Sequence, residues 1–314
     1  MTSDTGHRPA GAPGHGHAHG PGPWSDRRQL LAALALLGAF MIAEVITAVL
    51  SGSLALLSDA GHMLADVGAI GGALWAIRLA ARPPSGKWTF GWRRAEILSA
   101  AANGITLLVV AGIVTAEAIT RLIRPPAVDG WPVIAVAVAG VAVNVAASWV
   151  LARANRSSLN IEGAFRHVLT DLYGFIGTLI AGIVIVTTGF TRADAIASLI
   201  VVVLMARAAW GLLRDSGLVL LEAAPEDTDL EEVRAHILSV PHVKGVHDLH
   251  AWTVTSGQPT LSAHVIVEDS CFQDGHAPRL LDQLQACLAG DFDIEHSTFQ
   301  LESAAHVGHE PGTH

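Results

Sequence analysis

The sequence predicts an α-helical membrane protein with six transmembrane helices, followed by a small cytoplasmic α+β domain with the element order αββαβ. Three observations support this fold class. Hydrophobic residues make up 51% of the 314 positions, and charged residues only 15%. The apolar residues are gathered in blocks, and runs of about 18 or more are long enough to cross a bilayer core of roughly 30 Å. From about residue 221 onward the chain is polar and long enough for one soluble domain.

Six apolar runs are long enough for membrane helices. In order they cover residues 30–50, 54–81, 95–122, 131–151, 163–188 and 193–213. Only three residues separate the first two runs, so these two helices should be antiparallel neighbours. Asn103 and Asn144, in the third and fourth runs, are typical of side chains that hydrogen-bond across a helix bundle. The runs define a transmembrane domain over residues 29–221.

The two ends of the chain are rich in histidine. Residues 1–28 contain His7, His15, His17 and His19 among Gly and Pro, a composition that cannot bury a core and predicts disorder. Residues 304–314 are expected to be a disordered tail of the same kind. The N-terminus has no early apolar segment of a cleavable signal peptide, so the first membrane helix should direct insertion.

Charge in the connections predicts the orientation. The segment between the second and third helices is the most basic connection, with Arg82, Lys87, Arg93 and Arg94, and the positive-inside rule places it in the cytoplasm. Both termini then lie in the cytoplasm as well, and only the pair Arg121 and Arg124 departs from this scheme. We expect a multi-pass membrane protein with both termini on the cytoplasmic side.

The polar part, residues 222–303, has a readable order of elements. We expect a helix at 229–238, strands at 246–255 and 260–268, a helix at 278–288 and a strand at 294–301. In the first strand Leu249, Ala251 and Thr253 alternate with Asp248 and other polar or aromatic residues. This order predicts a small, mainly antiparallel sheet with helices on one side.

Two pairs of ionisable residues interrupt the membrane runs. His62 and Asp66 are four residues apart, as are His167 and Asp171, so each pair lies on one helix face. Two imidazoles and two carboxylates suit a tetrahedral ion such as Zn²⁺. Pairs of this kind can also serve helix packing through His–Asp hydrogen bonds. Two pairs of identical spacing favour a metal site, because carboxylates on neighbouring membrane helices would repel without a cation or protons between them.

The same four residues suggest a mechanism. Metal ligands must be deprotonated, so metal and protons compete for the site, as an antiporter requires. A zinc enzyme is one alternative, but a catalytic site keeps three protein ligands and one open position, whereas here four ligands would close the shell. A membrane-bound zinc sensor is another alternative, as is an exporter whose main substrate is a different divalent metal.

Composition excludes other classes of partner. A formal net charge of −9, without a basic patch, argues against nucleic acid as a partner. The two cysteines, Cys271 and Cys287, both lie in the polar domain and form no CxxC motif. They predict reduced structural thiols and no disulfide framework.

Several motifs, in order, carry a resemblance to a known family. They are SGSLALLSDAGHMLAD at 51–66, FGWRRAEIL at 90–98, HVLTD at 167–171, HDLHAW at 247–252 and HSTFQLE at 296–302. The sequence resembles the cation diffusion facilitator family over residues 28–303, most closely the zinc transporters of the bacterial cobalt–zinc–cadmium resistance branch. The resemblance implies a homodimer that exchanges cytoplasmic Zn²⁺ for protons, a secondary active transporter and not an enzyme. It also implies that the cytoplasmic αββαβ domain is metallochaperone-like and that the protein lies in a bacterial inner membrane.

The resemblance also assigns residues. His62, Asp66, His167 and Asp171 match the family's transport site, and two His with two Asp are typical of its zinc and cadmium carriers. In the cytoplasmic domain His247, His264, His296 and Glu302 match positions that bind regulatory zinc at the dimer interface, and His276 matches a bridging ligand. Trp88 and Trp92 stand where some members have loop ligands, so no loop site is expected. Arg94 and Glu222 match a pair near the membrane face.

Overall fold

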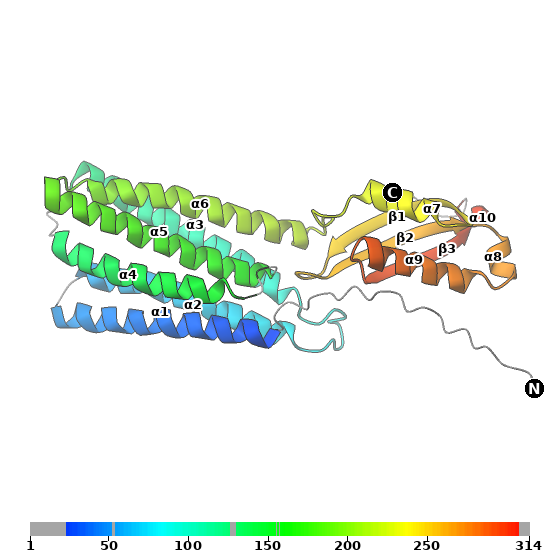
Figure 1. Ribbon diagram of the computed structural model, residues 1–314, viewed down its shortest axis with the longest axis horizontal. Helices are drawn as coiled ribbons and strands as arrows, with labels where there is room; N and C mark the ends of the chain where they lie inside the picture. The colour runs from blue at the N-terminus through cyan, green and yellow to red at the C-terminus, as the bar shows by residue number, and fades with distance from the viewer. Residues whose placement is uncertain (1–22, 52–53, 126–129, 155, 157, 308–314) are drawn as a thin grey trace, which may run out of the picture.

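The computed structural model of the protein describes residues 23–51, 54–125, 130–154, 156 and 158–307. Six long helices run beside one another, and a separate α+β domain follows them at one end (Figure 1). The helices are α1 (Pro23–Ser51), α2 (Leu54–Ala80), α3 (Ala95–Ile123), α4 (Gly130–Leu151), α5 (Leu159–Thr188) and α6 (Ala193–Leu220). The predicted His-rich segment before Pro23, the short turn at 52–53 and most of the C-terminal tail lie outside the described residues.

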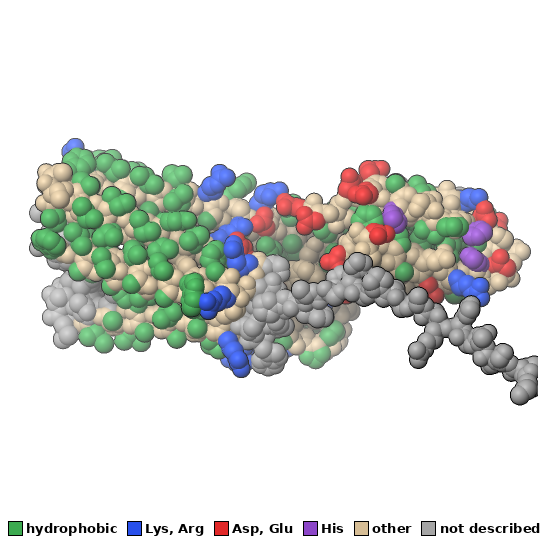
Figure 2. Space-filling view, in the orientation of Figure 1, with side chains coloured by type: hydrophobic (Ala, Val, Ile, Leu, Met, Phe, Trp, Pro, Cys, Tyr) green, Lys and Arg blue, Asp and Glu red, His purple; other side chains and the backbone are tan. Residues whose placement is uncertain are grey.

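Within the described residues, four helices are long and apolar enough to cross a membrane: α3, α4 over Val133–Leu151, α5 and α6. For α1 and α2 a crossing stays a prediction. Hydrophobic side chains cover the visible face of the helical part, whereas charged side chains gather at its junction with the α+β domain and on that domain (Figure 2). Large side chains such as Ile113, Trp131 and Val203 are exposed on this surface, as lipid-facing residues would be.

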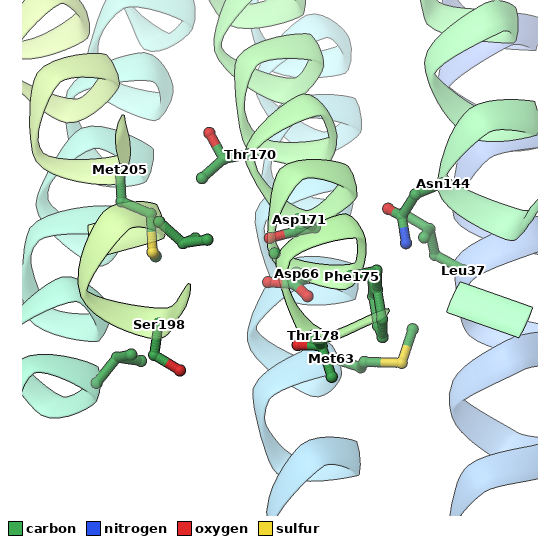
Figure 3. Close-up of a pocket in the computed structure, with 13 residues that line it drawn as sticks. Leu37, Met63, Asp66, Asn144, Thr170, Asp171, Phe175, Thr178, Ser198 and Met205 are labelled. Carbon is green, nitrogen blue, oxygen red and sulfur yellow. The ribbon is translucent and has the colours of Figure 1, made fainter. Parts of the chain in front are cut away.

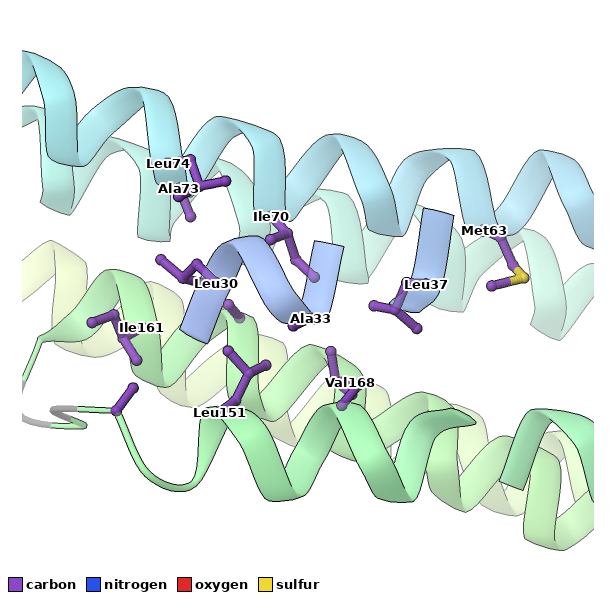
Figure 4. Close-up of a cluster of buried hydrophobic side chains, with 13 residues drawn as sticks. Leu30, Ala33, Leu37, Met63, Ile70, Ala73, Leu74, Leu151, Ile161 and Val168 are labelled. Atoms are coloured by element: carbon purple, nitrogen blue, oxygen red, sulfur yellow. The ribbon is translucent and has the colours of Figure 1, made fainter. Parts of the chain in front are cut away.

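The helices form two groups. One apolar core is shared by α1, α2, α4 and α5, where Leu30, Leu37, Ile70 and Val168 are buried against one another (Figure 4). A smaller core between α3 and α6 contains Leu107 and Met205, together with two alanines. The α6 helix also packs against α5, so α5 touches both groups.

Two polar details fix α5. Its first turn is capped by Ser158, whose Oγ accepts a hydrogen bond from the Ile161 amide at 3.4 Å. This cap explains why α5 begins four residues before the predicted position 163. Inside the bundle Asn160 is buried, and its Nδ2 donates to the Ala73 carbonyl of α2 at 2.9 Å. A buried amide that finds a backbone acceptor ties α5 to α2 at a fixed height.

The α+β domain has the predicted element order with two short helices added. It consists of α7 (Leu230–Ser239), β1 (Val243–Thr253), β2 (Pro259–Val267), α8 (Ser270–Gln273), α9 (Ala277–Asp291), β3 (His296–Ser303) and α10 (Ala304–Val307). The strand order is β1-β2-β3, with β1 antiparallel and β3 parallel to β2. Helices α7 and α9 share one core with one face of the sheet, as expected.

The simple alternation predicted for β1 is wrong at one place. The register shifts between His247 and His250, and Asp248 has a φ of 48°, the left-handed region. This bulge inserts one extra residue, so Val246 and Leu249 both pack toward the helices although they are three apart. His247 points to the opposite face, beside His264 of β2, its partner in the register.

The tip of the β1–β2 hairpin touches the membrane helices. Thr255 Oγ1 donates to Glu96 of α3 at 2.9 Å, and the Leu159 amide at the start of α5 donates to Ser256 Oγ at 3.0 Å. Gly257 supplies the positive φ that this turn requires. The two parts of the molecule therefore meet through hydrogen bonds at a defined turn.

Close packing of α4 on α5 gives a first prediction. A Cβ added to Gly140 would overlap the ring of Phe175, whereas one added to Gly112 of α3 meets nothing within 4 Å. Gly140→Ala should therefore destabilise the protein by about 1–3 kcal/mol, the usual cost of overpacking, seen as a lower melting temperature in detergent. Gly112→Ala, the control, should melt at the same or a slightly higher temperature, and equal loss in both variants would contradict the packing assignment.

Candidate functional site

Three of the four predicted membrane residues meet between α2 and α5. His167 Nε2 lies 2.6 Å from Asp66 Oδ1 and 3.8 Å from Asp171 Oδ2. Asp66 and His167 are 3% and 1% exposed, and Asp171 is largely covered as well. One ligand atom from each residue lies within 4.8 Å of the others, a spacing compatible with one metal ion. The side chain of His62 lies outside the described part of the chain, although its backbone belongs to α2 one turn before Asp66.

The local structure explains this convergence. His167 and Asp171 are one turn apart on α5, so both side chains leave the same helix face. Asp66 reaches them from α2, which is held at the matching height by the bond from Asn160 to Ala73. Ile70 of α2 and Val168 of α5 are also buried in the same apolar core. The group is thus placed by helices and not by loops.

A cavity of about 200 Å³ lies beside the two carboxylates (Figure 3). All six long helices contribute to its wall, which contains Leu37, Met63, Asp66, Val114, Asn144, Thr170, Asp171, Phe175, Ser198 and Met205 among others. Since a water molecule occupies about 30 Å³ of liquid, the space can hold an ion together with several waters. The carboxylates therefore border a space that a cation could enter.

Asn144 is a site residue that the sequence pattern assigned to packing. It is buried on α4 and lines the cavity with the two carboxylates. Its Nδ2 donates to the Gly140 carbonyl at 3.0 Å, and within the described residues its Oδ1 has no hydrogen-bond partner. A buried amide oxygen facing a cavity can accept from water there. An amide within an apolar helix indicates that it needs a polar partner, but this signal does not place Asn144 at the cavity.

A second group of ligand-type residues lies on the open face of the sheet. Glu302 of β3 is 3% exposed and lies between two imidazoles, with Oε2 at 3.2 Å from His247 Nε2 and Oε1 at 2.7 Å from His264 Nδ1. Gln300 Nε2 also donates to Glu302 Oε1 at 2.7 Å. These three residues form a group whose ligand atoms lie within 4.8 Å of one another.

The other two residues assigned to this site lie elsewhere in the chain. His296 pairs with Thr260 at the start of β3, six residues from Glu302, or about 20 Å along a strand at roughly 3.3 Å per residue. His276 precedes α9, and its ring lies 4.9 Å from that of His242. Within one chain, therefore, the structure joins His247, His264 and Glu302 and leaves His296 and His276 apart.

Comparison with known proteins identifies the family. The model described as the cation efflux transmembrane domain matches residues 30–221, and the model described as the cation efflux protein, cytoplasmic domain, matches residues 225–304. The chain belongs to the cation diffusion facilitator family. Proteins of this family transport metal cations through membranes, so this chain is a metal cation transporter and not an enzyme.

Individual relatives cover nearly the whole transporter. The metal cation efflux system protein CzcD of Cupriavidus metallidurans is 42% identical over 291 residues, which are 93% of this chain and 90% of that protein. The zinc transporter ZitB of Escherichia coli is 41% identical over 293 residues, 92% of each chain. A cadmium, cobalt and zinc/H(+)-K(+) antiporter of Bacillus subtilis is 35% identical over 293 residues, 93% of each.

A solved structure is also similar in sequence. It is the metal-bound C-terminal domain of the CzcD transporter from Cupriavidus metallidurans, which is 41% identical, covers 24% of this chain and 99% of its own, and has a TM-score of 0.22.

Two pairs of residues named in the sequence analysis lie in or next to the connections between the elements. Arg94 Nη2 lies 2.9 Å from Glu222 Oε1, a pair exposed enough to contribute at most about 1 kcal/mol. In the loop between α2 and α3, the rings of Trp88 and Trp92 stack with centroids 4.1 Å apart. The two indole rings therefore pack against each other in this loop.

The group around His242 gives a pH-dependent prediction. His242 Nδ1 lies 2.9 Å and Lys244 Nζ 2.6 Å from the two carboxylate oxygens of Glu268, and these contacts lower the pKa of Glu268 to about 2. Glu268 should therefore stay ionised when the pH falls below the ordinary glutamate range near 4.3. The stabilisation from these contacts is present above that range and is lost as the pH falls through about 2.

Carboxyl ¹³C chemical shifts of labelled glutamate in the full-length protein measure this pKa. His242→Ala should move the pKa of Glu268 upward toward its ordinary range, because the hydrogen bond from His242 is the largest cause of the shift. Lys244→Met should also raise it while leaving His242 in place. A Glu268 titration that is the same in wild type and His242→Ala would contradict the assignment.

Proposed function

We propose that this transporter is a proton-coupled antiporter that exports Zn²⁺ from the cytoplasm, with Cd²⁺ and Co²⁺ as secondary substrates. The ion would bind to His62, Asp66, His167 and Asp171 and would be exposed to each side in turn by alternating access. The observation that carries the proposal is the meeting of Asp66, His167 and Asp171 inside an apolar helix bundle, within 4.8 Å of one another.

The chemistry of the group supports a transported ion. Nitrogen and oxygen ligands without a thiolate suit zinc and permit its release. His167 and the two carboxylates would supply three ligands, and His62, one helical turn before Asp66 in the sequence of α2, would supply the fourth. One relative is named a zinc transporter, and another is named a cadmium, cobalt and zinc antiporter; together these names support this range of substrates.

Protons are the natural counter-ions at this site. Two carboxylates within reach of one imidazole, removed from water, are unfavourable unless positive charge is present. Zn²⁺ supplies that charge when bound, and protons on the same side chains supply it when the ion has left. Each cycle would therefore move metal in one direction and protons in the other. The name of the Bacillus subtilis relative, which includes H(+) exchange, supports this coupling.

The orientation follows from charge. The arginines and lysine of the loop between α2 and α3, together with the α+β domain, would lie in the cytoplasm, so export runs away from that domain. A bacterial inner membrane with both termini inside is the location that fits this scheme.

We further propose that the cytoplasmic domain forms a homodimer and senses Zn²⁺ through His247, His264 and Glu302. Two imidazoles and one buried carboxylate leave one tetrahedral position for another ligand. His296 and His276 do not reach this group within one chain. They would take part only through the second subunit of the dimer. A dimer is supported by the short name of the family model that matches residues 225–304, ZT_dimer.

The transport site is tested by removing one carboxylate. Asp171→Ala should reduce zinc uptake into proteoliposomes to background and should abolish the accompanying proton movement, because one ligand and one proton carrier are lost together. Zinc flux is followed with a zinc-sensitive dye and proton flux with a pH-sensitive dye inside the same vesicles.

Asp194→Asn is the matched control, because it neutralises a carboxylate at the start of α6 that is paired with Arg121 Nη1 at 3.1 Å, and Arg121 keeps Glu117 as a partner. This variant should transport zinc like the wild type. Wild-type flux in Asp171→Ala would refute the site, and normal zinc flux without proton movement in the wild type would refute the coupling.

The sensing role makes a separate prediction. His264→Ala should leave the maximal transport rate within about two-fold but should shift the zinc concentration at which transport rises, since Glu302 would lose one of its two imidazole partners. Transport rate against free zinc on the cytoplasmic-domain side measures this shift. Complete loss of transport, or a curve that coincides with the wild type, would count against a regulatory site.

A further inference from the structure

A third group of ligand-type side chains lies on the helical side of the cytoplasmic domain. His236 of α7 and Asp291 of α9 contact each other, with Nε2 and Oδ2 at 3.0 Å. Cys287, one turn before Asp291 on α9, joins them, and one ligand atom from each residue lies within 4.8 Å of the others. The thiol, imidazole and carboxylate come from two helices that are distant in sequence, so the fold brings them together.

The two helices that carry these side chains are fixed by the hydrophobic core of the domain. Val233 and Ile237 anchor α7 in the core of the domain, while Leu284 and Leu288 anchor α9 in the same core. The ring of Phe292 contacts His236 edge to face, with centroids 5.5 Å apart. The contact with Phe292 thus helps to orient the imidazole ring, and its Nε2 faces Asp291. His236 and Asp291 remain 39% and 58% exposed, which leaves a path for an ion from solution.

This group is separate from the one around Glu302. Along β2, Ala263 and Val265 face the helices and belong to the core, whereas His264 between them faces the other side. The sheet therefore lies between the two groups. Since His236, Cys287 and Asp291 all belong to one chain, the group is complete without a second subunit.

The ligand set indicates the class of ion. Bond lengths of about 2.3 Å to sulfur and 2.0–2.2 Å to nitrogen and oxygen put the ligand atoms of a tetrahedral zinc site roughly 3.3–3.7 Å apart. The present group needs only small side-chain rotations to reach that spacing. A thiolate favours soft or borderline cations over magnesium or manganese. Three protein ligands would leave one position for water.

An ion pair alone does not explain the group. Exposed His–Asp pairs are common and contribute little, but such a pair has no need of a thiol beside it. Burial and the neighbouring Asp291 carboxylate raise the pKa of the Cys287 thiol, which keeps it protonated in the absence of metal. A divalent cation that binds Asp291 reverses this effect, so metal binding would release the thiol proton.

We propose that His236, Cys287 and Asp291 form a second cytoplasmic binding site for a soft divalent cation, Cd²⁺ or Zn²⁺, that clamps α7 to α9 within one chain. The site differs from the membrane site in having a thiolate, and it should therefore prefer Cd²⁺ more strongly. Because α7 follows directly on the linker from α6, the clamp would fix the point where the linker enters the domain.

Cadmium absorbance on the full-length protein in detergent tests the proposal, because a thiolate bound to Cd²⁺ gives a charge-transfer band in the ultraviolet. On titration with Cd²⁺, the wild type should develop this band with a final intensity that corresponds to one Cd²⁺–thiolate bond per chain. Cys287→Ala should lose it. Cys271→Ala is the matched control, since Cys271 is buried in the core outside the group, and it should keep the band.

Two further variants separate this site from the others. His236→Ala should weaken the cadmium affinity of the band by about ten-fold or more, since even indirect partners of a metal ligand typically change affinity by ~10–100-fold. His247→Ala, on the other face of the sheet, should leave the band and its affinity unchanged. A band that persists in Cys287→Ala, or an affinity that is the same in His236→Ala and wild type, would overturn the proposal.

Protection from alkylation keeps the test valid if Cys287→Ala fails to fold. In the wild-type chain Cd²⁺ should slow the reaction of Cys287 with N-ethylmaleimide, measured by mass spectrometry of the modified peptide. Mg²⁺ at the same concentration should leave the reaction unchanged. Equal labelling of Cys287 with and without Cd²⁺ would exclude the site.

Discussion

Two carboxylates and one imidazole are held together between α2 and α5, away from water, and the structure of the helical part is arranged around this group. An isolated charged side chain at the centre of a bilayer costs about 2.5–3.5 kcal/mol on insertion scales, so two carboxylates beside one imidazole require positive charge, which protons on the group can supply. His167 lies within hydrogen-bond distance of Asp66 and near Asp171. Their positions require α2 and α5 to be neighbours at a fixed height, which the bond from Asn160 to Ala73 provides.

Most of the fold follows from patterns that the sequence displays openly. The six apolar runs and the order of strands and helices in the polar domain correspond to elements of the structure, with differences of a few residues at their ends. The extension of α5 depends on the cap at Ser158, and the extension of α6 to Leu220 takes it beyond the apolar run into polar residues. Such boundaries are set by local hydrogen bonds and by neighbouring elements, which hydrophobicity does not report.

The positions of individual side chains were harder to predict from the sequence than the fold. Equal spacing of His and Asp on two helices predicted that the pairs would meet, since helical periodicity fixes which residues share a face. It could not predict that Asn144 of α4 lines the same cavity, because that depends on how α4 is rotated against α5. The bulge at Asp248 was also hidden, since a left-handed residue within a strand shifts the faces without changing the composition. Likewise, the meeting of His236 with Cys287 depends on the tertiary contact between α7 and α9.

The hairpin of β1 and β2 connects the α+β domain to the helix bundle through hydrogen bonds. His247 and His264 lie on its strands, and at its tip Thr255 and Ser256 hydrogen-bond to the ends of α3 and α5. Each such bond contributes about 0.5–1.5 kcal/mol, or more where it reaches the charged Glu96. Coupling between sites in proteins is typically 1–3 kcal/mol, so making or breaking these two contacts is sufficient to carry it. The α5 helix also contains His167 and Asp171, which are half of the proposed transport ligands. A metal ion that changes the position of the hairpin would therefore act directly on this helix.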